Sequence, residues 1–270
     1  MTLDPRIGRL GIDTSKPGFY DDPTFMAAER ADPRMLEAYA DFVEERDYTE
    51  DYIASAETCV ERTAQFLYER LASDGRKGAC IDASCVLSRF LERQGVWNYM
   101  VKGGLTVVFP TKSGLARAYF SPIMSHDNPA VAGHVWVCAP PFRVVDLTVS
   151  LQPYKKGAEK YLTPGPLLAK SPQGRPFELT ATDLFDPSDD YQAAYGRPHP
   201  TLQQAKRDDP KLFERIERYG AIEVPFQDAQ LRYFACGISA PDLPLEEIRS
   251  LSLSGKWPNE VWSDFEKAAR

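Results

Sequence analysis

Apolar residues recur every three or four positions over several stretches of the chain, which is the period of one face of a helix. This period predicts helices over residues 33–47 and 49–71 and a third helix that begins at Cys80. Gly95 is expected to end the third helix, because glycine commonly stops helices. The apolar face of this helix consists of Ala83, Val86, Leu87, Phe90 and Leu91.

The C-terminal part of the chain contains shorter helical patterns. Pro210 follows two aspartates and Gly220 lies ten residues later, which marks the start and end of one helix. Residues 1–32 are rich in Pro, Gly and Asp and are expected to be irregular. Residues 150–209 are rich in proline, and they form either a long wrap over the core or the rim of a site. Two more helices are expected over residues 243–251 and 258–269.

Strict alternation of side-chain type predicts β-strands between the helices. The pair Gly103-Gly104 indicates a bulge or a close backbone approach within one strand. Helices followed by antiparallel strands favour an α+β fold, and 270 residues are compatible with a single domain. The expected strands are 99–109, 116–120, 134–138, 142–148 and 231–238.

Composition excludes several classes of protein. A net charge of −7 argues against non-specific nucleic-acid binding, which needs a basic surface. No apolar run approaches the length of a membrane helix, and the N-terminus has no secretory signal pattern. Five cysteines without a C-x-x-C pair do not indicate a disulfide framework or a zinc site, and no cofactor is expected. A cytoplasmic location is predicted, or export without a visible signal peptide. Oligomeric state is left open.

The strands at 134–138 and 142–148 are predicted to form a hairpin. Residues 139–141 would form its loop, so that Cys138 faces Phe142, Trp136 faces Val144, and His134 faces Asp146. Opposed residues in such a hairpin have Cβ atoms about 5 Å apart, which allows an imidazole–carboxylate hydrogen bond. A slip by one residue would send Asp146 to the other face. The alternative is a hairpin in which this His and Asp are incidental.

Cys80 stands at the predicted start of its helix, after Gly78 and the small Ala79. The positive end of the helix macrodipole favours a thiolate there, and Asp82 in the first turn suits the same field. A thiolate beside an imidazole and a carboxylate is the arrangement that nucleophilic catalysis needs. The alternative is a cysteine that serves as a small buried hydrophobe.

These residues predict a division of roles. Cys80 would attack a carbonyl carbon, His134 would take and return the proton, and Asp146 would orient the imidazole. Backbone N–H groups at the start of the Cys80 helix would form part of an oxyanion hole. Gln65 and Tyr68 are candidates for its second donor, and Trp136 is a candidate for substrate binding or a core residue.

The stretches GACIDASCVLSRFLERQGV, GHVWV and VVDLT resemble the transglutaminase-like superfamily of papain-fold cysteine enzymes. In that superfamily a cysteine opens a helix, a histidine begins a strand and an aspartate follows in the next strand, which matches Cys80, His134 and Asp146. The resemblance covers residues 76–150. It implies a papain-like fold with this stretch as the catalytic core, residues 1–75 as an N-terminal helical part and residues 151–270 as an extension that wraps the core.

The superfamily contains protein cross-linkers, deamidases, peptidases and inactive scaffolds, so three functions remain open. The first is acyl transfer or hydrolysis at an amide of a protein or peptide, through a Cys-His-Asp triad. The second is acetyl transfer from acetyl-coenzyme A, because Arg76, Gly78 and Cys80 also resemble the motif of arylamine N-acetyltransferases, although Lys77, Asp82 and Ser84 depart from it. The third is a catalytically inactive scaffold that binds a protein partner.

Overall fold

The centre of the molecule is an antiparallel sheet with strand order β7-β6-β5-β1-β10-β9-β8, and β2 pairs with β1. The computed structural model describes residues 4–125, 128–131, 133–155, 157–170, 175–185, 196 and 198–268. The strands of this sheet are β1 Tyr99–Val108, β2 Ala118–Phe120, β5 His134–Ala139, β6 Phe142–Asp146, β7 Leu167–Lys170, β8 Arg175–Pro176, β9 Ala221–Phe226 and β10 Ala229–Ser239. A separate pair consists of β3 Ile123–Ser125 and β4 Asn128–Val131.

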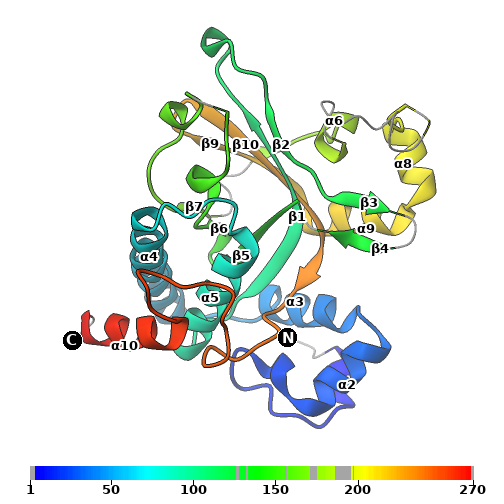
Figure 1. Ribbon diagram of the computed structural model, residues 1–270. Helices are drawn as coiled ribbons and strands as arrows, with labels where there is room; N and C mark the ends of the chain where they lie inside the picture. The colour runs from blue at the N-terminus through cyan, green and yellow to red at the C-terminus, as the bar shows by residue number, and fades with distance from the viewer. Residues whose placement is uncertain are drawn as a thin grey trace.

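Helices cover both faces of the sheet, so the fold is mixed α and antiparallel β, in agreement with the predicted α+β class (Figure 1). One group consists of α1 Pro5–Gly8, α2 Pro23–Ala31 and α3 Met35–Glu44. The opposite group consists of α4 Glu50–Ser73, α5 Cys80–Arg93 and α10 Pro258–Ala268. The remaining helices are α6 Ala181–Leu184, α8 Leu202–Asp208 and α9 Pro210–Tyr219, and the 3-10 turns are η1 Phe19–Asp21, η2 Thr111–Ser113, η3 Val149–Leu151 and η4 Glu159–Tyr161.

Alternation along β5 supplies side chains to two separate hydrophobic cores. Trp136 and Cys138 enter the core beneath α2 and α3. Val135 and Val137 enter the core that α4, α5 and α10 cover. Because successive strand residues point to opposite faces, one short strand connects both layers of the protein.

The hairpin of β5 and β6 forms, but its predicted register is wrong. Val137 pairs with Val145 and Ala139 pairs with Phe142, with an irregularity between the two pairs. Continued from Val137, this register is displaced by two residues from the predicted one. A displacement of two preserves the face, so His134 and Asp146 become diagonal neighbours on the same side instead of direct partners.

A second irregularity lies between Phe142 and Val144 where β6 pairs with β7. It turns Phe142 into the α4–α5 core while Val144 enters the opposite core. The predicted register, with Phe142 opposite Cys138 and Val144 opposite Trp136, implied that both lie on one face. This is wrong, because the extra residue of a bulge reverses the direction of the side chains that precede it.

Two predictions about local structure fail. The stretch expected to be irregular, 1–32, contains helices at Pro5–Gly8 and Pro23–Ala31, and Asp22 caps the second of these by accepting the backbone N–H of Thr24 at 2.7 Å, with Pro23 at the first helical position. The cap and the proline are short, local signals that stabilise a helix only slightly, and α2 is stable because Phe25 packs into the core. Residues 243–251 form turns instead of a helix, although Leu245, Ile248 and Leu251 are buried with helix-like spacing.

The other helix predictions are confirmed within one to three residues, and residues 210–219 form α9 between Asp209 and Gly220 as expected. β10 lies next to β1 in the middle of the sheet, so the C-terminal part of the chain completes the sheet. Within 150–209 the described residues contain β7, β8, α6 and α8 in addition to two 3-10 turns.

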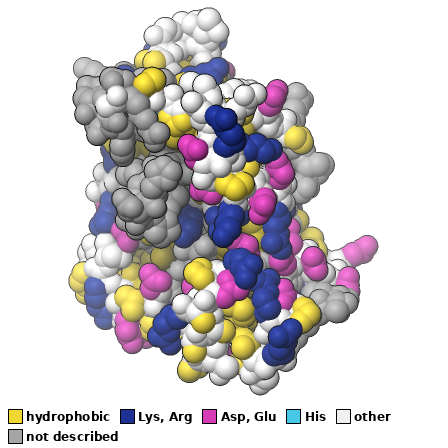
Figure 2. Space-filling model, turned by 90° about the vertical axis from the view of Figure 1, so that its right-hand side faces the viewer, with side chains coloured by type: hydrophobic (Ala, Val, Ile, Leu, Met, Phe, Trp, Pro, Cys, Tyr) yellow, Lys and Arg dark blue, Asp and Glu magenta, His cyan; other side chains and the backbone are white. Residues whose placement is uncertain are grey.

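The helices α3 and α9 lie against each other through ion pairs. Arg215 pairs with Glu37 at 2.8 Å, and Arg218 pairs with Asp41. Figure 2 shows the side of the molecule on the right of Figure 1, where basic and acidic side chains are interspersed. This side therefore does not carry the single-sign field that would steer a strongly charged polymer.

The pair Gly103-Gly104 marks both features that its sequence suggests. The β1–β10 register shifts between Lys102 and Gly103. A Cβ atom on Gly103 would lie 2.0 Å from the carbonyl oxygen of Phe234 and 2.9 Å from the Trp136 ring. Gly103 is also paired with His134 on β5, so this close approach lies next to the strand residue that carries the imidazole.

Candidate active site

Cys80 is the first residue of α5, as its sequence context predicts. The turn into the helix uses Gly78 at φ +68°, a left-handed conformation that glycine adopts without strain. The Gly78 N–H donates to the carbonyl of Leu151 at 3.2 Å, which joins this turn to the segment after β6. No side chain caps the helix, so the N–H groups of its first turn remain directed at the space around the thiol.

The start of α5 lies beside the start of β5. The hydroxyl of Ser84, one turn after Cys80, donates to the carbonyl of Val135 at 3.2 Å. The backbone of Val135 also approaches the Cys80 thiol and lowers its pKa. The adjacent residue on the strand is His134, so the packing of α5 on β5 brings thiol and imidazole together.

His134 and Asp146 form a buried pair. Nε2 of His134 and Oδ2 of Asp146 are 2.6 Å apart, and the two side chains are 0% and 1% exposed. Nδ1 is then the nitrogen left for the thiol. The thiol and the imidazole affect each other's pKa, yet Nδ1 has no partner at full hydrogen-bond geometry. The two groups are therefore in polar contact without a fully aligned hydrogen bond, which is common for catalytic pairs in the absence of substrate.

Asp146 is held by four donors. Oδ2 accepts from Nε2 of His134 and from the hydroxyl of Tyr233, the latter at 2.8 Å. Oδ1 accepts from the backbone N–H and the hydroxyl of Thr148, at 2.8 and 3.0 Å. Gln152 donates in turn to the Thr148 hydroxyl at 3.1 Å. A buried carboxylate with this many donors keeps its charge and its orientation.

Electrostatics inside the cluster favours a thiolate–imidazolium pair. Burial opposes the charge on His134, but the Asp146 carboxylate and the thiol raise the pKa of His134 to about 10. Burial likewise opposes a thiolate, but hydrogen bonding and the charge of His134 outweigh it and lower the pKa of Cys80. Burial acts on Asp146 too, and the positive imidazole together with its hydrogen bonds lowers the pKa of Asp146.

Other cysteines behave in the opposite way. Burial raises the pKa of Cys85, Cys138 and Cys236 to about 12 each. The Cys138 thiol donates to the carbonyl of Arg143 at 2.8 Å and serves as a packed core group. Burial alone therefore does not activate a cysteine here, and the contact with His134 distinguishes Cys80.

The remaining predicted site residues lie in three settings. Gln65 is exposed on α4 and donates to Glu69 at 2.9 Å. Tyr68 is buried, and its hydroxyl accepts from Ser150 at 3.3 Å. The two oxyanion assignments stay predictions, because within the described part of the chain no hydrogen bond joins either side chain to the thiol. Trp136 is 4% exposed and packs against the His134 ring, with centroids 6.4 Å apart, so it supports the imidazole from the core.

Sequence reasoning missed three members of the cluster. Tyr233 lies 87 positions from Asp146, and nothing local in its strand distinguishes it from other core tyrosines. Thr148 and Gln152 carried a weak local signal, since Asp and Thr two residues apart commonly bond through the turn that follows a strand. His126 lies outside the described residues.

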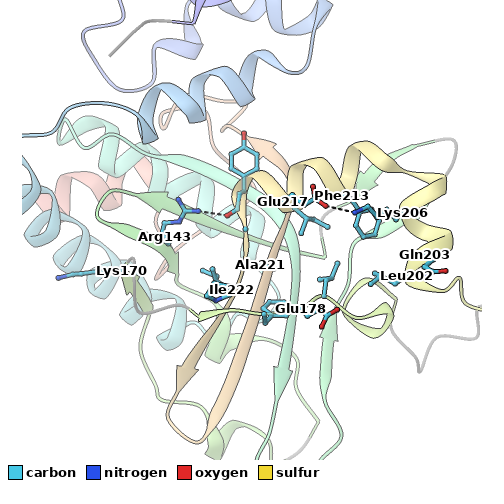
Figure 3. Close-up of a pocket in the computed structure, with 16 residues that line it drawn as sticks. Arg143, Lys170, Glu178, Leu202, Gln203, Lys206, Phe213, Glu217, Ala221 and Ile222 are labelled. Carbon is cyan, nitrogen blue, oxygen red and sulfur yellow. Dashed lines mark hydrogen bonds and ion pairs between the residues drawn. The ribbon is translucent and has the colours of Figure 1, made fainter.

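Access to the thiol is narrow. Cys80 is 9% exposed, while the adjacent Ile81 is 51% exposed. A cavity of about 830 Å³ lies elsewhere, between α8, α9 and the edge of the sheet. Figure 3 shows Arg143 and Lys170 at one end of it and Lys206 at the other. Each of these cations has a carboxylate neighbour, namely Glu44 for Arg143, Glu57 for Lys170 and Glu217 for Lys206.

No family model matches the chain, and neither a curated protein nor a solved structure is significantly similar to it. Among the helices of the described residues, none has the length and apolar character to span a membrane. In the same part of the chain, no group of three or more His, Cys, Asp or Glu side chains is arranged to hold a metal ion.

Proposed function

We propose that the protein is a cysteine-dependent enzyme that transfers or hydrolyses the acyl group of an amide, with Cys80 as nucleophile, His134 as acid–base and Asp146 as orienting carboxylate. The proposal includes a transglutaminase-like, papain-like core. A single observation carries the proposal: the buried imidazole of His134 lies between the Cys80 thiol, at the start of α5, and the Asp146 carboxylate. The distance from His134 Nε2 to Asp146 Oδ2 is 2.6 Å.

The reaction begins with the thiolate of Cys80. Sulfur attacks the carbonyl carbon, and the C–N bond of the amide breaks as the leaving nitrogen takes a proton from Nδ1 of His134. The product of this step is a thioester on Cys80 and a free amine. Water or a second amine then gives a proton to His134 and attacks the thioester, which releases the acyl product and restores the thiolate–imidazolium pair.

Asp146 contributes through His134. Its Oδ2 holds the imidazole so that Nδ1 faces the thiol, and its charge stabilises the imidazolium. The N–H groups at the start of α5 supply positive potential where the carbonyl oxygen gains charge.

The test uses Cys80→Ala and, as matched control, Cys85→Ala on the same helix. Wild type is offered glutamine peptides with and without a primary amine, and release of ammonia and amide transfer are both measured. Loss of turnover in Cys80→Ala with retention in Cys85→Ala is expected. Turnover that survives in Cys80→Ala contradicts the proposal.

A second candidate is the inactive scaffold, which the low exposure of Cys80 favours. It predicts that iodoacetamide labels Cys80 no faster than other cysteines near pH 6.

Acetyl transfer predicts a stable acetyl adduct on Cys80 after incubation with acetyl-coenzyme A, which intact-mass measurement detects.

A further inference from the structure

Tyr233 reaches the candidate site from a distant strand. β10 and β6 are separated in the sheet by β1 and β5, yet the Tyr233 hydroxyl donates to Asp146 Oδ2 at 2.8 Å. The sheet must therefore curve so that a side chain from β10 crosses two strands. Gly103 on β1 has no side chain, and a Cβ there would meet the Phe234 carbonyl and the Trp136 ring, so β1 and β10 approach each other closely beside this path.

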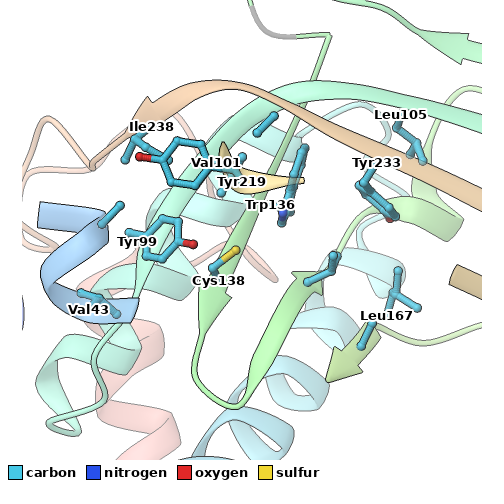
Figure 4. Packing of buried hydrophobic residues seen from close by; sticks show 14 of the residues in the cluster. Val43, Tyr99, Val101, Leu105, Trp136, Cys138, Leu167, Tyr219, Tyr233 and Ile238 are labelled. Atoms are coloured by element: carbon cyan, nitrogen blue, oxygen red, sulfur yellow. The ribbon is translucent and has the colours of Figure 1, made fainter. Parts of the chain in front are cut away.

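The Tyr233 ring is fixed by its neighbours. It is 0% exposed and meets the Trp136 ring edge-on, with centroids 5.1 Å apart, as Figure 4 allows the reader to follow. The centroid of the His134 ring lies 6.0 Å from that of the Tyr233 ring. Because rings and hydroxyl are held together, the phenol has one position and one acceptor, the carboxylate of Asp146.

The two carboxylate oxygens of Asp146 have different hydrogen-bond partners. Oδ1 is anchored by the two donors of Thr148, which fix the direction of the carboxylate. Oδ2 is shared between the imidazole of His134 and the phenol of Tyr233. A donor that shares an oxygen withdraws part of the negative charge that the imidazole experiences.

We propose that Tyr233 is a positioning residue of the reactive centre, whose phenol sets how strongly Asp146 acts on His134 and, through His134, on Cys80. The inference rests on the proposed function insofar as it takes Cys80 to be the reactive thiol. Among the described residues, the titratable groups that face the pair are Cys80 from α5, Tyr154 from the segment after η3 and Tyr233 from β10.

Removal of the phenol hydroxyl is expected to shift the pH midpoint of Cys80 alkylation in one direction, downward. In Tyr233→Phe the carboxylate keeps its orientation through Thr148 but loses a donor at Oδ2, so its full charge acts on the imidazolium. The imidazolium gains stability and favours the thiolate more strongly. The pH midpoint of Cys80 alkylation is expected to fall by about half a unit, since one hydrogen bond changes the pKa of the carboxylate itself by about one unit and the effect is partly transmitted.

The experiment measures the rate of Cys80 alkylation by iodoacetamide from pH 4 to 10, with the modified peptide identified by mass. The control is Tyr99→Phe, which removes a buried phenol that donates at 2.7 Å to a different carboxylate, that of Glu44. Tyr99→Phe is expected to leave the midpoint unchanged. In an Asp146→Asn background, Tyr233→Phe is expected to cause no further change, because its route of action is gone.

Replacing Tyr233 by 3-fluorotyrosine keeps the shape and strengthens the donor, so the midpoint is expected to rise; this variant also serves if Tyr233→Phe does not fold. An unchanged midpoint in a folded Tyr233 variant, or a midpoint that moves in the opposite direction, overturns the inference. If wild-type Cys80 alkylates with the midpoint of an ordinary thiol, the proposed function itself has failed, and this outcome is distinct from a failure at Tyr233.

Discussion

Asp146→Asn removes the charge of the candidate site with little change of shape. His134 is fully buried, and burial lowers the pKa of an imidazole; the Asp146 carboxylate, together with the smaller effect of the Cys80 thiol, raises the pKa of His134 to about 10. Without that charge the ring is neutral near neutral pH, and Cys80 loses its cationic partner. A thiol of ordinary pKa near 8.5 is about 1% thiolate at pH 6.5, and each unit by which the pKa of Cys80 is lowered raises that fraction up to about tenfold. The alkylation rate of Cys80 at pH 6.5 is therefore expected to fall by about tenfold or more.

The assay is the second-order rate of iodoacetamide labelling at Cys80, read by peptide mass, with urea unfolding measured in parallel. Asp183→Asn is the matched control, because Asp183 is equally buried and pairs with Arg232 at 3.2 Å. Both variants are expected to lose about 1–3 kcal/mol of unfolding free energy, since each leaves a buried polar group without its partner. Only Asp146→Asn should slow labelling. A folded Asp146→Asn protein that labels within threefold of wild type refutes the reasoning.

Three further predictions concern stability. The folded-state pKa of Asp146 lies below its usual 3.8, so its stabilising contribution is present above pH 4 and is lost as pH falls through the folded value; urea midpoints should fall more steeply below pH 4 for wild type than for Asp146→Asn. Gly103→Ala should cost about 1–3 kcal/mol or more because its Cβ would meet backbone, whereas Gly237→Ala meets only a flexible lysine, and equal urea midpoints would contradict this. Arg89→Leu breaks buried ion pairs and should lower the free energy of unfolding by about 3–5 kcal/mol. The more exposed Arg93→Leu should lower it by less than about 1 kcal/mol, and urea unfolding measures both.

The sequence predicts those parts of the site that depend on local order. Cys80 opens a helix because Gly78 permits the turn and the apolar period begins directly afterwards. His134 begins a strand because alternation requires it, and Asp146 ends the next strand. The predicted register is wrong, but His134 and Asp146 still lie on the same face because the register is displaced by two residues, an even number. No local sequence pattern reveals the size of this displacement.

The parts that could not be predicted depend on distant contacts. The contact of Tyr233 with Asp146 depends on the placement of β10 beside β1, a pairing between residues more than 120 positions apart. Residues 243–251 keep helix-like spacing but bury their apolar side chains from turns, because packing on the α4–α5 core outweighs a short helical pattern.

The most direct measurement is alkylation of the native protein with limiting iodoacetamide at pH 6, followed by peptide mass analysis of all five cysteines. Unfolded protein at the same pH provides the reference in which every thiol is equally accessible. The account predicts that Cys80 labels at least tenfold faster in the native protein than in the unfolded one, while Cys85, Cys138 and Cys236 label more slowly. Native labelling of Cys80 at or below the unfolded rate would contradict it.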